Sequence, residues 1–365
     1  ICKPLIGTVG YNYRDWSGLF YPQGASSRRQ LALFGQHFGV CELTQFSHQM
    51  PDIERVAHFA AQVKSELKFF VRIHQAFTHT ADVGMALTIA KHFRKAMEPL
   101  FEQQKLAGLV AAFPYAFKNS AENREYVAQL AHALRFDGLV FQVDFRHPSW
   151  ANPKTFDWMA QNGLGYVCVD EPQLPGLLPP LSVATANHVL VRLHGRNAET
   201  WWSGNATTRF DYTYSIDELS ELMARYNPLW QNGHEVSFVF QNYWQAQSVR
   251  NGLQFSAMLR EEYLQARAEL MAARRAAEPV VSVYDVESDS EVEERARPPL
   301  SLSYAELKSR VSQVLGDPVE SSVQPDQTSM DLPLRAVVVE EIDATGRQSR
   351  AVVASDNILD AQEQN

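Results

Sequence analysis

The chain has 365 residues, of which 45% are hydrophobic, enough apolar surface for a sizeable folded core. Its three cysteines include no Cys-x-x-Cys pair, which argues against a disulfide framework or a zinc ribbon, and no apolar run is long enough to span a bilayer. The net charge of −9 is unevenly distributed: residues 276–365 hold 18 acidic and 7 basic residues, a net charge of −11, and the rest of the chain has a net charge of +2.

This charge boundary predicts a folded domain over residues 1–275 and an acidic, largely disordered tail over residues 276–365. The tail has no Trp, Phe or Cys, so apolar burial cannot offset its ordering entropy. Its pattern allows a short helix at Tyr304–Leu315 and a strand at Leu334–Ile342. We interpret the tail as a solvated extension, with an arm that binds a protein partner as the alternative. No signal-peptide pattern is visible, which favours a cytoplasmic location without membrane contact.

Short runs rich in Val, Ile, Leu and Phe alternate with amphipathic stretches in the folded region. The runs show little polar–apolar alternation, which is typical of parallel strands covered on both faces. We expect strands at Leu5–Val9, Val40–Thr44, Lys68–Ile73, Ala107–Ala112, Leu139–Asp144, Tyr166–Val169, His188–Leu193 and Val236–Phe240. We expect helices at Arg28–Phe38, Asp52–Ser65, Asp82–Gln104, Ala121–Leu134, Pro153–Gln161, Ser215–Trp230 and Tyr243–Ala273.

Eight strands and seven helices predict an α/β fold of the (β/α)₈ TIM type with one degenerate helical unit. That unit is Glu171–Asn187, where Pro and Gly are too frequent for a helix. Asp52, Ser120, Asn152 and Ser215 stand where helix N-caps are expected. A doubly wound open sheet is the alternative. No phosphate-loop motif for a nucleotide follows any strand.

Ionisable or amide side chains follow seven of the eight expected strands. Loops at the carboxyl ends of the strands build the site in such barrels, so these side chains should face one cavity. Arg192 and His194 alternate with apolar residues, so both should face the barrel interior. A buried arginine needs a partner, and Glu42 or Asp144 would supply it.

Each of these groups also has a purely structural interpretation. Glu42 and Arg72 could fill the barrel as an ion pair, and His194 could be a hydrogen-bonded core histidine. The Arg146-His147 pair could stabilise a turn. Four tryptophans could either pack or line the ligand cleft: Trp16, Trp150, Trp201 and Trp202.

The chain resembles the YecE-like family, the domain of unknown function 72, in several segments. The most specific are Gly7-Thr-Val-Gly-Tyr-x-Tyr-x-x-Trp16-x-Gly18-x-Phe20-Tyr-Pro22, Asp144-Phe-Arg-His-Pro-Ser-Trp150 and Arg192-Leu-His-Gly-Arg196. The resemblance extends from Gly7 to Leu259 and leaves the tail outside. It implies a TIM-type barrel, and it implies no reaction because the family has no established activity.

Seven positions depart from the pattern that the resemblance implies. Thr44, Ser47, His48 and Ala112 replace an Asn, a Phe-Tyr pair and a Gln, and Arg72, Asp144 and Gln241 replace a Lys, a Glu and an Asn. We expect that either the substrate differs or activity is lost.

The residues at the strand ends favour an enzyme, of the hydrolase or lyase kind, that acts by acid/base chemistry on a small polar or anionic substrate, including phosphorylated ones. No cofactor motif is visible. The predicted catalytic residues are Glu42, Asp144, His147, Asp170 and His194. The predicted substrate-binding residues are Tyr11, Trp16, Arg72, His79, Arg146, Trp150, Arg192, Arg196, Tyr212 and Asn242.

Three further hypotheses remain open at this point. A divalent metal ion could be held by the five predicted catalytic residues, although no tight His spacing supports it. Aromatic and basic residues could bind or process nucleic acid: Tyr11, Tyr13, Trp201 and Trp202 lie among Arg14, Arg196 and Arg209. This hypothesis is less favoured because the folded region has a net charge of only +2. A non-catalytic binding scaffold is the third.

Overall fold

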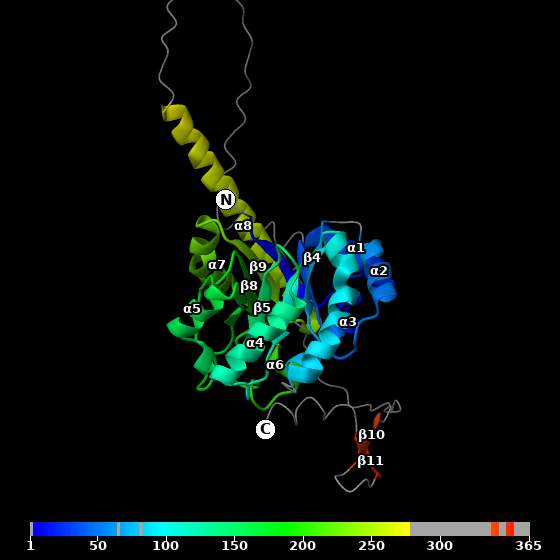
Figure 1. Cartoon of the computed structure of the whole chain (residues 1–365). Coiled ribbons are helices and arrows are strands. Elements are labelled where there is room, and N and C mark those ends of the chain that lie inside the picture. Colours follow the sequence, from blue (N-terminus) through cyan, green and yellow to red (C-terminus); the bar gives the residue numbers. More distant parts are fainter. Residues whose placement is uncertain (1–2, 64–65, 80–82, 278–336, 343–347, 354–365) are drawn as a thin grey trace, which may run out of the picture. The chain divides into compact units, whose positions relative to one another are not determined.

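Nine short strands form one parallel sheet in the computed structural model, which describes residues 3–63, 66–79, 83–277, 337–342 and 348–353. The strands are apolar and largely buried because their side chains fill the inner face of the sheet. Helices cover its outer face (Figure 1). Their bounds are β1 (Leu5–Val9), β2 (Val40–Leu43), β3 (Lys68–Arg72), β4 (Leu106–Ala112), β5 (Phe141–Asp144), β6 (Leu164–Tyr166), β7 (Cys168–Asp170), β8 (His188–Leu193) and β9 (Glu235–Phe240).

The sheet curls into a nearly closed barrel. Its strand order is β6-β5-β4-β3-β2-β1-β9-β8-β7, and β6 and β7 are separated only by Val167, whose N–H donates to the carbonyl of Val143 at 3.0 Å. One interrupted strand therefore pairs with β5 through its first half and with β8 through its second. This confirms eight strand positions and the TIM-type fold, and the doubly wound alternative is wrong. The sixth strand is longer than the predicted Tyr166–Val169: it begins at Leu164 and ends at Asp170.

Helices follow most strands and begin at the expected N-caps. Asp52 Oδ1 accepts from the Arg55 N–H at 3.0 Å, and Ser215 forms a capping box with Glu218. The helices are α1 (Ser27–His37), α2 (Ile53–Gln62), α3 (Val83–Glu102), α4 (Ala121–Leu134), α5 (Pro153–Gln161), α6 (Ala206–Arg209), α7 (Ile216–Gln231) and α8 (Gln247–Ala277). Short 3₁₀ helices lie at Arg14–Trp16, Gln45–Ser47, Gln75–Phe77, Pro148–Trp150 and Trp244–Ala246.

Two parts of the chain depart from regular strand–helix alternation: residues 171–187 and the start of α8. Residues 171–187, all described, contain no helix, so the degenerate unit is confirmed. The last helix begins at Gln247 instead of the predicted Tyr243, because Gln245 and Ala246 have left-handed φ values of 46° and 58° that interrupt it.

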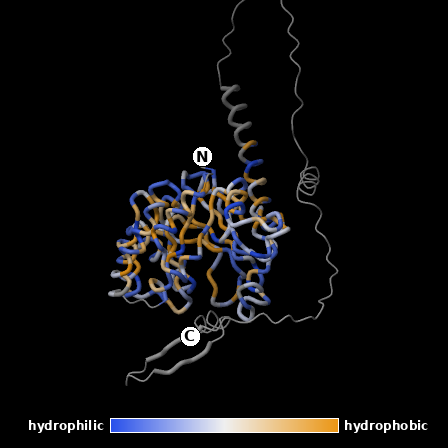
Figure 2. The backbone as a smooth tube through the Cα atoms, turned by 90° about the vertical axis from the view of Figure 1, so that its right-hand side faces the viewer, coloured by the Kyte–Doolittle hydropathy of each residue, from blue (hydrophilic) through white to orange (hydrophobic). Residues whose placement is uncertain are grey.

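The barrel interior changes from apolar to charged along the strands. Val40, Phe70 and Leu190 belong to the buried apolar cluster, and Figure 2 shows many hydrophobic segments in the interior of the folded region. Two residues further along β2, β3 and β8, on the same face, come Glu42, Arg72 and Arg192. This charged layer lies at the carboxyl ends of the strands.

The tail contributes one described element, an antiparallel pair of β10 (Val337–Ile342) and β11 (Gln348–Val353). The strand predicted at Leu334–Ile342 is thus present as β10. The helix predicted at Tyr304–Leu315 and most of the tail predicted to be disordered lie outside the described residues. Among the helices that the structure describes, none is long and apolar enough to cross a membrane.

Candidate functional site

Five charged side chains form an ion layer across the barrel: Glu42, Arg72, Asp144, Arg146 and Arg192. Arg192 is at its centre, with Nη2 2.6 Å from Glu42 Oε2 and Nη1 bonded to Asp144 Oδ2. Arg72 Nε donates to Glu42 Oε1 at 3.0 Å, and Arg146 Nη2 lies 3.2 Å from Asp144 Oδ2. The predicted interior position of Arg192 and its pairing are confirmed. Each carboxylate therefore joins the central arginine to an outer one.

The ion layer carries a surplus positive charge toward one side. Burial alone would raise the pKa of Glu42, but Arg192 and Arg72 outweigh it and hold the pKa below its ordinary value. Both carboxylates and Arg192 are fully buried, whereas the side chains of Arg72 and Arg146 are 21% and 25% exposed. Three guanidinium groups face two carboxylates, so the uncompensated charge lies at Arg72 and Arg146.

A pocket of about 300 Å³ opens at these two exposed arginines. It is formed by the loops that leave the carboxyl ends of the strands, as in other barrels of this type. Its lining residues are Ser47, His48, Arg72, Ile73, Gln75, Thr78, His79, Ala112, Phe113, Pro114, Tyr115, Arg146, Glu171, Leu177, Trp201, Trp202, Ser203, Gly204 and Arg209. Of the predicted site residues, the pocket therefore contains Arg72, His79 and Arg146.

Glu171, which the sequence prediction passed over in favour of Asp170, lies in this pocket. Its side chain is buried, and its Oε1 accepts from the Leu178 N–H at 2.9 Å. Burial raises the pKa of Glu171 to about 7, against the lowering effect of Arg146 and the Leu178 hydrogen bond. Side-chain alternation could have found it: Val169 faces the interior, so Glu171 does too, and Asp170 faces outward.

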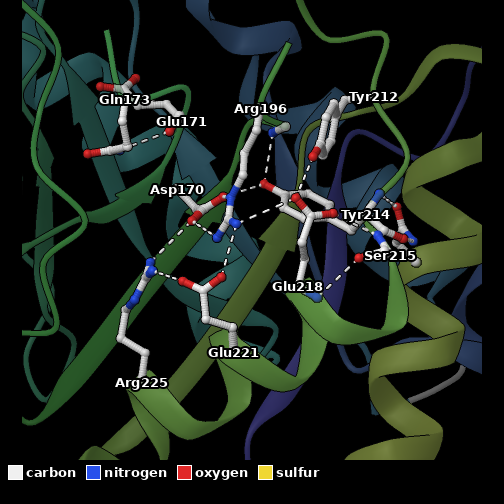
Figure 3. A network of polar contacts seen from close by, with 12 residues as sticks. Asp170, Glu171, Gln173, Arg196, Tyr212, Tyr214, Ser215, Glu218, Glu221 and Arg225 are labelled. Carbon is white, nitrogen blue, oxygen red and sulfur yellow. Dashed lines mark hydrogen bonds and ion pairs between the residues drawn. The ribbon is translucent and has the colours of Figure 1, made fainter. Parts of the chain in front are cut away.

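Asp170 belongs to a second network on the outer side of the barrel, between β7, β8 and α7 (Figure 3). It accepts from Tyr214 Oη at 2.9 Å, from Arg196 Nε at 2.8 Å and from Arg225 Nη1 at 3.2 Å. Tyr212 joins the same network through a hydrogen bond from its Oη to Glu218. Figure 3 shows Glu171 apart from this network. The structure thus places Asp170, Arg196 and Tyr212 away from the pocket.

His194 is buried behind the pocket and is held neutral. Burial, and then Arg146, Arg192, Arg72 and Arg209, lower its pKa well below the ordinary value. Arg146 Nη1 lies 3.3 Å from His194 Nε2, and a cation can only donate, so the ring proton belongs on Nδ1. A proton-transfer role near neutral pH does not fit this environment. His194 fits the structural interpretation better, as a hydrogen-bond acceptor that orients Arg146.

The remaining predicted residues lie in packing and capping positions outside the pocket. Trp16 Nε1 donates to the Tyr243 carbonyl and Trp150 Nε1 to the Phe117 carbonyl, both at 2.7 Å. His147 Nδ1 caps the 3₁₀ helix at Pro148–Trp150 by accepting from the Ser149 N–H.

Tyr11 and Trp201 are buried, with 9% and 5% of their surfaces exposed, and of the two only Trp201 lines the pocket. The expectation of an exposed aromatic surface for nucleic acid is therefore wrong for these two residues. Asn242 is buried as well, and its Nδ2 donates to the Tyr212 carbonyl and to Asn251 Oδ1.

The candidate metal ligands do not come together. Among the residues that the structure describes, no group of three His, Cys, Asp or Glu side chains is close enough to hold a metal ion. Arg192 occupies the space between Glu42 and Asp144, and Asp170 is on the outer side of the sheet. The geometry gives the five predicted ligands no shared centre.

Comparison with known proteins agrees with this architecture. Residues 5–276 match the model of the family described as "Protein of unknown function DUF72". The chain belongs to this family. UPF0759 protein YunF of Bacillus subtilis (strain 168) is 26% identical over 273 residues, which cover 71% of this chain and 95% of that protein.

Two crystal structures of DUF72 proteins are similar to this chain. One from Thermotoga maritima MSB8 has a TM-score of 0.64 at 30% identity and covers 70% of this chain and 98% of its own. Another, from Enterococcus faecalis V583, has a TM-score of 0.63 at 25% identity and covers 70% and 95%. Membership of DUF72 establishes the barrel and leaves the reaction open.

Of the seven positions at which the sequence departs from the expected pattern, Ser47, His48, Arg72 and Ala112 line the pocket. Thr44, Asp144 and Gln241 do not, although the Thr44 carbonyl accepts from Ser47 Oγ at 2.6 Å.

Proposed function

We propose that this chain is an enzyme that binds a small anionic molecule in the pocket and acts on it by acid/base chemistry, with Glu171 as the acid and base. One observation carries the proposal: the pocket joins the partly exposed side chains of Arg72 and Arg146 to a buried carboxyl group whose pKa is about 7.

The arginines support an anionic ligand because their positions are fixed before the ligand arrives. Arg72 and Arg146 are each bonded to a carboxylate that Arg192 also binds, so little side-chain entropy is left to lose on binding. Arg72 Nη2 is itself buried and lies 2.9 Å from Glu42 Oε1, so an anion would meet Arg146 and the partly exposed remainder of the Arg72 side chain. Guanidinium groups commonly bind carboxylate and phosphate.

Glu171 supports acid/base chemistry because both of its protonation states are populated near neutral pH. A general acid or base works best when its pKa is close to the working pH. Among the neighbouring charges, Arg146 lowers the pKa of Glu171, and Asp144 and Asp170 raise it. An anionic ligand at Arg146 would raise the pKa of Glu171 further, which favours the proton-donating form.

A nucleic-acid function has weaker support. Base stacking needs exposed aromatic faces, and Tyr11 and Trp201 are buried. Tyr13 stacks on Tyr243, with ring centroids 4.6 Å apart and planes 5° apart. A pocket of about 300 Å³ suits a small molecule.

Thermal unfolding of the full chain with inorganic phosphate tests the anion site. A ligand that binds the folded state raises the melting temperature by mass action, so phosphate should stabilise the wild type and stabilise Arg146→Gln much less. Arg135→Gln is the matched control, because Arg135 is exposed and follows α4 at the opposite end of the barrel. Equal stabilisation of Arg146→Gln and the wild type would place the anion elsewhere.

A further inference from the structure

The wall of the pocket has chemically different parts. One part is cationic, with Arg72, Arg146 and Arg209. A second is aromatic, with Tyr115 and Trp202, and a third carries the hydroxyl groups of Ser47, Thr78 and Ser203. A ligand that fills this pocket must match all three parts at once.

The aromatic part is a right-angled corner. The side chain of Trp202 is 51% exposed although Trp201 next to it is buried. The rings of Tyr115 and Trp202 have centroids 6.2 Å apart and planes at 84°. Two perpendicular rings cannot cover both faces of one planar base, but they can contact two sides of a non-planar ring.

Two of the three hydroxyl groups of the wall, those of Ser47 and Ser203, already donate their protons within the chain. Ser47 Oγ donates to the Thr44 carbonyl at 2.6 Å, and Ser203 Oγ donates to the Glu199 carbonyl at 3.4 Å. A hydroxyl group that has used its proton still has a lone pair to accept a hydrogen bond. This part of the pocket therefore suits a ligand with its own hydroxyl donors, whereas the arginines suit an anion that only accepts.

We propose that the pocket binds a phosphate monoester of a small sugar, with the phosphate at Arg72 and Arg146 and the sugar ring in the corner of Tyr115 and Trp202. A phosphate monoester is a pure acceptor that carries nearly two negative charges at pH 7, and the sugar supplies the hydroxyl donors. The cavity of about 300 Å³ is near the lower limit for ligand pockets, which fits one monosaccharide unit. This proposal rests on the anion site of the proposed function.

Calorimetric titration of the full chain with four probes tests this assignment: inorganic phosphate, ribose 5-phosphate, ribose and adenosine 5′-monophosphate. Ribose 5-phosphate should bind at least tenfold more tightly than phosphate, ribose or the nucleotide. Trp202→Ala should weaken ribose 5-phosphate about tenfold, as loss of an aromatic contact does, and leave phosphate unchanged. Leu19→Ala is the matched control, because Leu19 is 63% exposed and does not line the pocket.

The outcomes separate the two proposals. If ribose 5-phosphate binds no better than phosphate, or Trp202→Ala weakens both equally, the sugar assignment is wrong and the anion site stands. If the nucleotide binds best, the ligand is a nucleotide and the sugar assignment is again wrong. If no phosphate compound binds, both proposals are overturned.

Discussion

Replacing Arg192 by Met tests whether the ion layer holds the pocket in place. Met removes the guanidinium group and keeps an apolar side chain of similar reach. Arg192 is fully buried and bonds two buried carboxylates, and removal of one partner from a buried ion pair costs about 3–5 kcal/mol. In the variant, Glu42 is still paired with Arg72, and Asp144 with Arg146. We therefore expect a loss near the lower end, about 3 kcal/mol in the free energy of unfolding at pH 7.

This loss should shrink in acid. The pKa of Glu42 in the folded wild type lies below its ordinary value of 4.5, so its stabilising contribution is present above that value and is lost as the pH falls through the folded-state pKa. Without Arg192 this pKa rises, so Glu42 takes up a proton at a higher pH and its uncompensated charge disappears. The difference between variant and wild type should be smaller at pH 5 than at pH 7.

Urea unfolding of the full chain at both pH values, followed by tryptophan fluorescence, measures this difference. Arg135→Met is the control; it removes one exposed hydrogen bond, to the Asn162 carbonyl, and should cost about 1 kcal/mol or less. Phosphate should also stabilise Arg192→Met less than the wild type, because Arg72 and Arg146 lose the carboxylate geometry that Arg192 sets. A loss below about 1 kcal/mol, the range of an exposed ion pair, or a loss equal at both pH values would refute the reasoning.

Four other expectations follow from single contacts. Glu171→Gln should flatten the pH dependence of stability. In the wild type, folding raises the pKa of Glu171 from 4.5 to about 7, so stability should fall by about 3 kcal/mol as the pH rises between those values. Urea unfolding of both proteins at pH 4.5, 6 and 8 measures this difference. Asp170→Asn should cost about 2–3 kcal/mol in urea unfolding and leave stabilisation by phosphate unchanged, since Asp170 is in the outer network; loss of phosphate binding would contradict that placement. Gly195→Ala should destabilise by about 2 kcal/mol or more, measured by thermal unfolding, because Gly195 has φ +92° and a Cβ would lie 2.6 Å from Tyr212 Cβ; an unchanged melting temperature would mean that this turn relaxes freely. Truncation after Ala277 should leave the main melting transition unchanged, whereas a broadened or lowered transition would show that the barrel depends on the tail.

The fold could be predicted because its signals are local. Apolar runs, N-caps and a Pro- and Gly-rich gap each depend on a few neighbouring residues, and Asp52 and Ser215 cap helices as expected. The errors fall where long-range contacts decide. The sixth strand is extended and interrupted because its halves pair with different neighbours, β5 and β8. The last helix starts late because Gln245 and Ala246 adopt left-handed backbone, which no residue type there announces.

The pocket was harder to predict because polarity at a strand end does not reveal which side of the sheet a side chain faces. Alternation along the strand predicts the interior position of Arg192 correctly. The same rule, applied to Cys168–Asp170 and one residue beyond, assigns Glu171 to the interior and Asp170 to the outer side. Tyr115 and Trp202 come from different loops, and no local pattern could have brought them together.

The complete burial of Arg192 distinguishes direct contact with a ligand from orientation of the residues that contact it, which the sequence alone could not do. A side chain with no exposed surface cannot touch a ligand in the pocket, so the predicted binding role of Arg192 is not what the structure supports. Yet both exposed arginines are oriented by carboxylates that Arg192 holds. In the proposed anion site Arg192 is therefore a positioning residue, and its loss should lower stability and anion binding together. Arg146→Gln, by contrast, removes a group that lies at the pocket itself, so anion binding should fall with a smaller loss of stability. The ratio of the two effects in the two variants distinguishes a residue that positions the site from one that belongs to it.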